Sequence, residues 1–124
     1  MSVEISERTI GLWFMSLNET TDFLAGLQST EEGFELRYRF RYYKEESPWS
    51  DKDEKHWYTV RIDKSKSKAE AIQATQLVVR LLEEKSGQQC DELLVRNGDT
   101  STFMAELASK RWAHMRFDKG EAAA

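Results

Sequence analysis

The chain has 124 residues, 40% of them hydrophobic and 32% charged, which is the size and composition of one globular domain that buries its own core. Its 18 basic and 22 acidic residues leave a formal net charge of −4. A free-standing, non-specific nucleic-acid binder is usually basic, because neutralising phosphates drives its affinity, so the overall charge argues against that class.

The first half of the chain predicts two strands on either side of an ambiguous segment. Residues 9–17 are rich in strand-favouring side chains and predict a buried or half-buried strand. Residues 19–28 fit a short helix capped by Asn18, or a strand joined by a turn to the next one, and we favour the helix. Residues 34–43 predict the second strand.

The segment 34–43 alternates large apolar side chains with arginines at the two-residue period of a β-strand. One face of the sheet therefore carries Leu36, Tyr38, Phe40 and Tyr42. The opposite face, which we call the arginine face, carries Arg37, Arg39, Arg41 and Tyr43. The first face is suited to a hydrophobic core, and the second to water or to a partner.

The next two elements are a strand and a long helix. Residues 56–63 predict the strand, which follows a 12-residue connection that is long for a hairpin and contains Trp49. Residues 67–86 predict the helix, which opens with the capping-box pattern of Ser67 and Glu70 and ends at a glycine. Its apolar side chains fall on one half of the helical wheel, so we expect this helix to cover the apolar face of the sheet.

The remaining elements are shorter. Residues 91–96 fit a short edge strand, residues 100–114 a second helix, and residues 118–124 a frayed, flexible tail. The sequence thus predicts a single α+β domain over residues 1–117, with a single-layer, mostly antiparallel sheet of three to four strands. The order of the elements fits the split βαβ sandwich or, alternatively, a simple antiparallel meander packed by two helices.

No residue pattern indicates a catalytic or metal site. The chain lacks a nucleophile elbow, a phosphate-binding glycine loop and a dinucleotide fingerprint. His56 lies near Asp51, Asp53 and Glu54, but zinc needs three or four Cys or His ligands, and a calcium loop needs a glycine and a distal acid at set offsets. We therefore expect no metal or cofactor, and an enzyme that uses His56 with Asp51 or Asp53 is the weakest hypothesis.

The number of cysteines and the length of the apolar runs indicate the cellular compartment of the protein. The single cysteine, Cys90, cannot form an intramolecular disulfide, which fits a reducing compartment, and we interpret it as an inert or half-buried thiol. The longest apolar run, Ile10 to Met15, is far shorter than the roughly 20 residues that span a bilayer. The first residues contain no apolar run of signal-peptide length. We therefore expect a cytoplasmic protein that does not contact the membrane.

The arginine face is the feature that indicates a partner. Arginine and large aromatic side chains are enriched among the residues that dominate protein interfaces. We therefore expect a non-enzymatic protein-binding module, whose partner is another protein or a second copy of the chain. The predicted contact residues are Arg37, Arg39, Arg41, Tyr43, Trp57, Arg61 and Trp49.

The same side chains support an alternative function, which is single-stranded nucleic-acid binding, since guanidinium groups bind phosphates and aromatic rings stack on bases. Lys64, Lys66 and Lys68 lie at the start of the long helix, where free N–H groups favour anions, and would extend that surface as anion-binding residues. A structural explanation competes with both functions, because arginine stems often cover an exposed sheet face and a second helix could lie over it. Both functions require an arginine face that is open to water.

Overall fold

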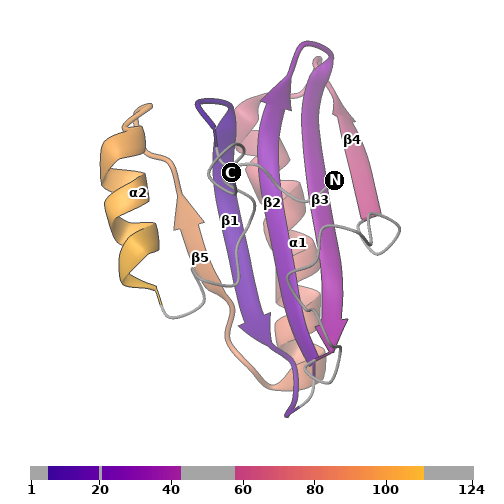
Figure 1. Cartoon of the computed structure of the whole chain (residues 1–124). Helices are drawn as coiled ribbons and strands as arrows, with labels where there is room; N and C mark the ends of the chain where they lie inside the picture. Colours follow the sequence, from indigo (N-terminus) through magenta and orange to yellow (C-terminus); the bar gives the residue numbers. More distant parts are fainter. Residues whose placement is uncertain (1–5, 20, 43–57, 111–124) are drawn as a thin grey trace.

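The computed structural model describes residues 6–19, 21–42 and 58–110. Within these ranges, five strands form one antiparallel sheet in the order β4-β3-β2-β1-β5, accompanied by two helices (Figure 1). The strands are β1 (Thr9–Ser16), β2 (Thr21–Thr30), β3 (Gly33–Tyr42), β4 (Tyr58–Asp63) and β5 (Asp91–Leu94). The helices are α1 (Lys68–Ser86) and α2 (Thr100–Ser109). The α+β class and the two predicted helices are confirmed.

The first four strands form a meander, in which each strand pairs with the next one along the chain. Strand β5 then pairs with β1 on the opposite edge of the sheet from β4. The antiparallel meander is thus the arrangement that the sheet adopts, and the split βαβ order is not. The connections from β1 to β2 (17–20) and from β2 to β3 (31–32) are short, and a short connection leads to an antiparallel neighbour, whereas a parallel neighbour needs a long crossover.

The predicted helix over residues 19–28 is wrong, because this segment forms β2, which pairs with β1 on one side and β3 on the other. Every residue from Thr21 to Leu27 is buried. A strand that is covered on both faces reads as a nearly continuous apolar run, so the two-residue alternation that marks a half-exposed strand is lost. The strand was therefore not recognised in the sequence, because it lies in the centre of the sheet and is covered on both faces.

Helix α1 covers one face of the sheet, which we call the helix face. Its buried side chains are Ala71, Thr75 and Val79. Ala71 and Val79 pack in one cluster with sheet residues that include Trp13, Met15, Phe23, Ala25, Leu27 and Leu36. The prediction that the long helix covers the apolar face is confirmed, and α1 crosses behind the sheet in Figure 1.

The ends of α1 also form as predicted. Ser67 Oγ accepts a hydrogen bond from the Glu70 N–H at 3.1 Å, and Glu70 Oε1 accepts one from the Ser67 N–H at 2.8 Å. Gly87 ends the helix with φ = 72°, a left-handed conformation that favours glycine. In the described part of the chain, neither helix has the length and apolar character needed to cross a bilayer.

Helix α2 packs on the other side of the sheet, beside β5. Phe103 and Leu107 contact Leu12, Leu24, Leu93 and Val95 to make a second core on the arginine face. The predicted bounds of this helix, 100–114, extend past the described residues, as does the predicted tail at 118–124. Strands β1 and β2 therefore have a hydrophobic core on each face.

Candidate functional site

The structure places the predicted arginines at alternate positions of β3. Their opposite residues in β2 are Gly26 for Arg37, Leu24 for Arg39 and Asp22 for Arg41. Arg39 is only 4% exposed, and its neighbour Leu24 belongs to the core beneath α2. The row of guanidinium groups expected to face water is thus interrupted at its centre.

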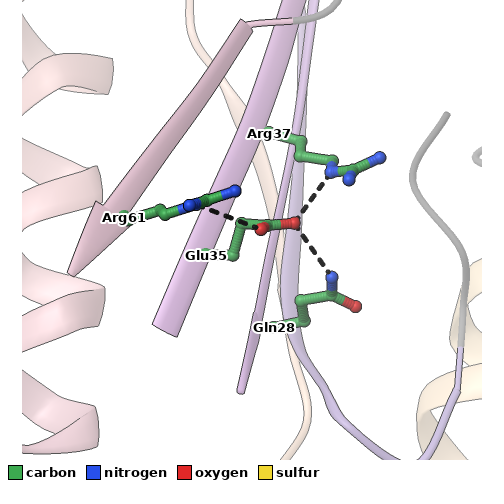
Figure 2. A network of polar contacts seen from close by, with 4 residues as sticks. All are labelled: Gln28, Glu35, Arg37 and Arg61. Atoms are coloured by element: carbon green, nitrogen blue, oxygen red, sulfur yellow. Dashed lines mark hydrogen bonds and ion pairs between the residues drawn. The ribbon is translucent and has the colours of Figure 1, made fainter. Parts of the chain in front are cut away.

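Glu35 organises the part of the arginine face nearest to β4 (Figure 2). Its Oε1 accepts hydrogen bonds from Arg37 Nε at 2.8 Å and from Gln28 Nε2 at 3.3 Å. Its Oε2 lies 4.0 Å from Arg61 Nε. The Arg61 side chain is 81% exposed, whereas that of Arg37 is 20% exposed. One carboxylate therefore offsets two cations, and Arg61 presents the larger exposed surface of the two arginines.

The predicted lysine patch lies where β4 turns into α1, and Lys64, Lys66 and Lys68 are all exposed. Acids lie among them. A hydrogen bond from the Ser65 backbone N–H, followed by its hydroxyl, lowers the pKa of Asp63. Likewise, hydrogen bonds from the backbone and then the hydroxyl of Ser67 lower the pKa of Glu70, and Lys66 contributes to both shifts. The patch is therefore a mixed-charge turn in which the Glu70 N–H is already bonded to Ser67.

Several predicted residues lie outside the described ranges, so their placement is not tested. They are Tyr43, Trp49 and Trp57 of the binding surface and Asp51, Asp53, Glu54 and His56 of the acidic connection. Among residues 6–19, 21–42 and 58–110, no three His, Cys, Asp or Glu side chains are grouped to hold a metal ion.

Cys90 is the one nucleophilic side chain of note in the described chain. Burial, followed by the negative charge of Glu83, raises the pKa of its thiol to about 12. A thiol with this pKa stays protonated at neutral pH, and the thiolate is the reactive form. The interpretation of Cys90 as an unreactive, part-buried thiol is consistent with this environment.

The residues that predict a contact surface most strongly were missed by the sequence reasoning, and they lie on the helix face. On this face, Glu92 of β5 connects α1 to the sheet by hydrogen bonds. This carboxylate accepts hydrogen bonds from Trp13 Nε1 at 2.8 Å and from Gln76 Nε2 at 3.0 Å. Glu83 adds a bond from the Cys90 N–H at 2.8 Å. These bonds connect the helix to the segment around β5, which lies at the edge of the sheet opposite to β4 (Figure 1).

An apolar groove of about 350 Å³ runs between α1 and strands β3 and β4. Its walls include Tyr38, Phe40 and Val60 from the sheet and Ala74 and Val78 from the helix. The Tyr38 and Tyr58 rings stack across the two strands, with centroids 5.3 Å apart and planes inclined by 24°. The aromatic side chains that line the groove itself are Phe23, Tyr38 and Phe40.

Large apolar side chains continue outward from this groove. We call them the apolar strip, and they are Tyr58 and Val60 of β4 (55% and 44% exposed) and Leu77, Val78 and Leu81 of α1 (62%, 48% and 57% exposed). On the helical wheel, Val78, Leu81 and Leu77 occupy neighbouring positions, on the side of α1 that faces away from Gln76. One signal for the strip exists in the sequence, since the apolar arc of this helix is wider than one sheet contact requires.

No protein-family model matches the chain, and no match was found among curated proteins or solved structures.

Proposed function

We propose that this chain is a non-enzymatic protein-interaction module and that its main contact surface is the apolar strip with the adjoining groove. The observation that carries the proposal is the group of five large apolar side chains, each between 44% and 62% exposed, beside a groove of about 350 Å³. Contiguous exposed apolar surface of this kind marks interaction sites, because water disfavours it and a partner that covers it gains the hydrophobic free energy.

A protein partner fits this surface better than a small molecule or a nucleic acid. Small-molecule sites hold a few convergent polar groups that orient the ligand. The polar side chains in the lining of the groove are Tyr38 and Thr75, and the Thr75 hydroxyl already donates to the Ala71 carbonyl at 3.0 Å. Nucleic acid needs cations, and the strip consists of apolar and tyrosine side chains. The partner that matches this surface is therefore another polypeptide, which would contact it with apolar side chains.

Binding through the arginine face stays a prediction. In the described part of that face, Arg39 is buried and Arg37 is bonded to Glu35, which leaves Arg61 as the arginine with the most exposed side chain. Single-stranded nucleic-acid binding would use this face together with the lysines and also stays a prediction. A cytoplasmic location, suggested by the single cysteine, is part of the proposal.

The proposal is tested by affinity capture from the native host with the tagged full chain and three variants. Leu81→Glu places a charge on the apolar strip, at a side chain that is 57% exposed, so the fold should tolerate it. Gln73→Glu adds the same charge at another exposed position of α1 and is the matched control. Arg61→Glu tests the arginine face.

We expect the same proteins to be retained by the wild type, Gln73→Glu and Arg61→Glu, and to be lost with Leu81→Glu. Thermal midpoints recorded in parallel should stay within a few degrees of the wild type. Identical capture by all four proteins would contradict the proposal, and loss with Arg61→Glu alone would transfer the function to the arginine face.

A further inference from the structure

We propose that the partner of the apolar strip is a second copy of this chain, joined by antiparallel pairing of β4 with β4 about a two-fold axis at Val60. The inference rests on the proposed function, because it names the occupant of the same surface. It follows from the hydrogen-bonding groups of β4, from the charges that its two possible registers bring together, and from the side of the sheet on which α1 lies.

Strand β4 is the end strand of the sheet in the described chain. The Lys64 N–H donates to the Glu32 carbonyl at 3.1 Å, and the register of β4 on β3 continues from there without a shift. Because bonding alternates along an antiparallel ladder, the even-numbered residues of β4 direct their backbone groups toward β3. Thr59 and Arg61 therefore direct their N–H and C=O groups away from β3, whereas the Asp63 carbonyl accepts a hydrogen bond from the Lys66 N–H at 3.0 Å.

The two edges of the sheet differ in how they are protected. Natural edge strands are commonly shielded by charges, bulges or a covering element. At the β5 edge, α2 packs beside the strand and Lys110 Nζ forms an ion pair with Asp91 Oδ1 at 3.0 Å. The β4 edge has no bulge, and its helix-face side chains Tyr58 and Val60 are exposed and apolar. This edge is the one suited to pairing.

Charge selects the register of such a pair. Residues opposite each other must lie on the same face, so the axis passes through a single residue of each copy, either Val60 or Arg61. With Arg61 at the axis, two guanidinium groups stand directly opposite each other, which is destabilising. With Val60 at the axis, Thr59 of each copy stands opposite Arg61 of the other and exchanges both backbone hydrogen bonds with it. The second register is the favoured one.

The same axis brings the two apolar strips together. A two-fold axis perpendicular to the sheet leaves each face on its own side, so both α1 helices lie on the same side of the joined sheet. Tyr58 and Val60 of both copies then lie between the two helices that carry Leu77, Val78 and Leu81. A specific interface buries roughly 800 Å² on each partner, more than the five paired residues of each strand provide by themselves, and the strips are the surface that extends the contact.

Cysteine cross-linking tests the register in the full chain with Cys90→Ser as background. Val60→Cys places the new thiols at the axis, where opposing Cα atoms of a non-hydrogen-bonded pair lie about 4.5 Å apart, within the range for a disulfide. We expect rapid oxidation to a disulfide-linked dimer for Val60→Cys, and little for Arg61→Cys or for Gln73→Cys on α1. Preferential linking by Arg61→Cys would overturn the proposed register.

Solution mass tests the dimer without cross-linking. We expect light scattering to give about twice the 14.5 kDa of one chain for the wild type and for Thr59→Ala. Thr59→Pro removes an outward N–H that bonds to nothing in the described sheet, so it should leave the fold intact and yield the monomer. A wild type that stays monomeric at every concentration overturns the inference, whereas capture of another protein that depends on Leu81 would leave the proposed function standing.

Discussion

Arg39 and Arg61 lie on the same face of the sheet and have opposite surroundings. Arg39 is in β3, beside the core that α2 makes with Leu24, and is 4% exposed. Arg61 is in the edge strand β4, and its side chain is 81% exposed. The alternation of residues in a strand determines which face a side chain is on, but the element lying over that face determines whether the side chain meets water.

This contrast leads to the first prediction. Reversing the charge at Arg39 with Arg39→Glu should lower the free energy of unfolding by about 3 kcal/mol, because an uncompensated charge would be buried. Arg61→Gln, the exposed control, should change it by less than about 0.5 kcal/mol. Urea denaturation measures both values, and equal midpoints for the two variants would show that Arg39 reaches solvent.

Cys90 gives a second prediction at the residue scale. Burial raises the pKa of its thiol from 9.0 to about 12, so its thiolate fraction at pH 8 is roughly 1,000-fold below that of an unperturbed thiol. A thiol-specific disulfide reagent should therefore react at least about 100-fold more slowly with the folded protein than with the chain in denaturant. Equal rates in the two conditions would place the thiol in solvent.

The same shift makes stability depend on pH. Between pH 9.0 and about 12 the unfolded thiol gives up its proton while the folded one keeps it, so the folded state binds more protons. The free energy of unfolding should therefore fall as the pH rises through this range, and fall less in Cys90→Ala. Comparing the two proteins removes the contribution of tyrosines and lysines that titrate in the same range.

At the scale of single elements, the hairpin between β2 and β3 depends on Gly33. Its φ of 140° lies in a region that side-chain-bearing residues rarely adopt, and a Cβ there would overlap the Ile62 carbonyl oxygen. Gly33→Ala should therefore cost more than about 2 kcal/mol of stability. Gly87→Ala is the matched comparison, since Gly87 has φ = 72° with open space around it, and it should cost about 1 kcal/mol. Chemical denaturation that ranks Gly87→Ala as the more damaging change would contradict this account.

Helix α1 has the predicted bounds, but part of its apolar side is exposed, which the sequence did not predict. The capping box and Gly87 are local signals, and they set the ends of the helix as predicted. Its link to the sheet through Glu92 is not local, because the second partner of that carboxylate, Trp13, is 79 residues away from Glu92 along the chain. Val78 and Leu81 stay exposed, although they belong to the apolar half of the helical wheel.

At the scale of the whole molecule, the central strands are held between two cores, one beneath α1 and one beneath α2. Phe103 in α2 is 2% exposed, whereas the next residue, Met104, is 37% exposed. Phe103→Ala should lower the free energy of unfolding by about 3–5 kcal/mol, and Met104→Ala by less than about 1 kcal/mol. If Phe103→Ala were as mild as Met104→Ala, α2 would not be part of the folded core.

The sequence by itself determined the features that depend on neighbours in the chain. The two-residue alternation of 34–43 placed the arginines on one face, because successive side chains of an extended backbone point to opposite sides. The Ser67 and Glu70 pattern set the start of α1 through hydrogen bonds between residues three apart in the chain. Tertiary structure alone decided that β2 is a strand, that Arg39 is buried and that α1 leaves an apolar strip uncovered. Each of these depends on which distant element packs over a residue, and a periodic pattern holds no information about that packing.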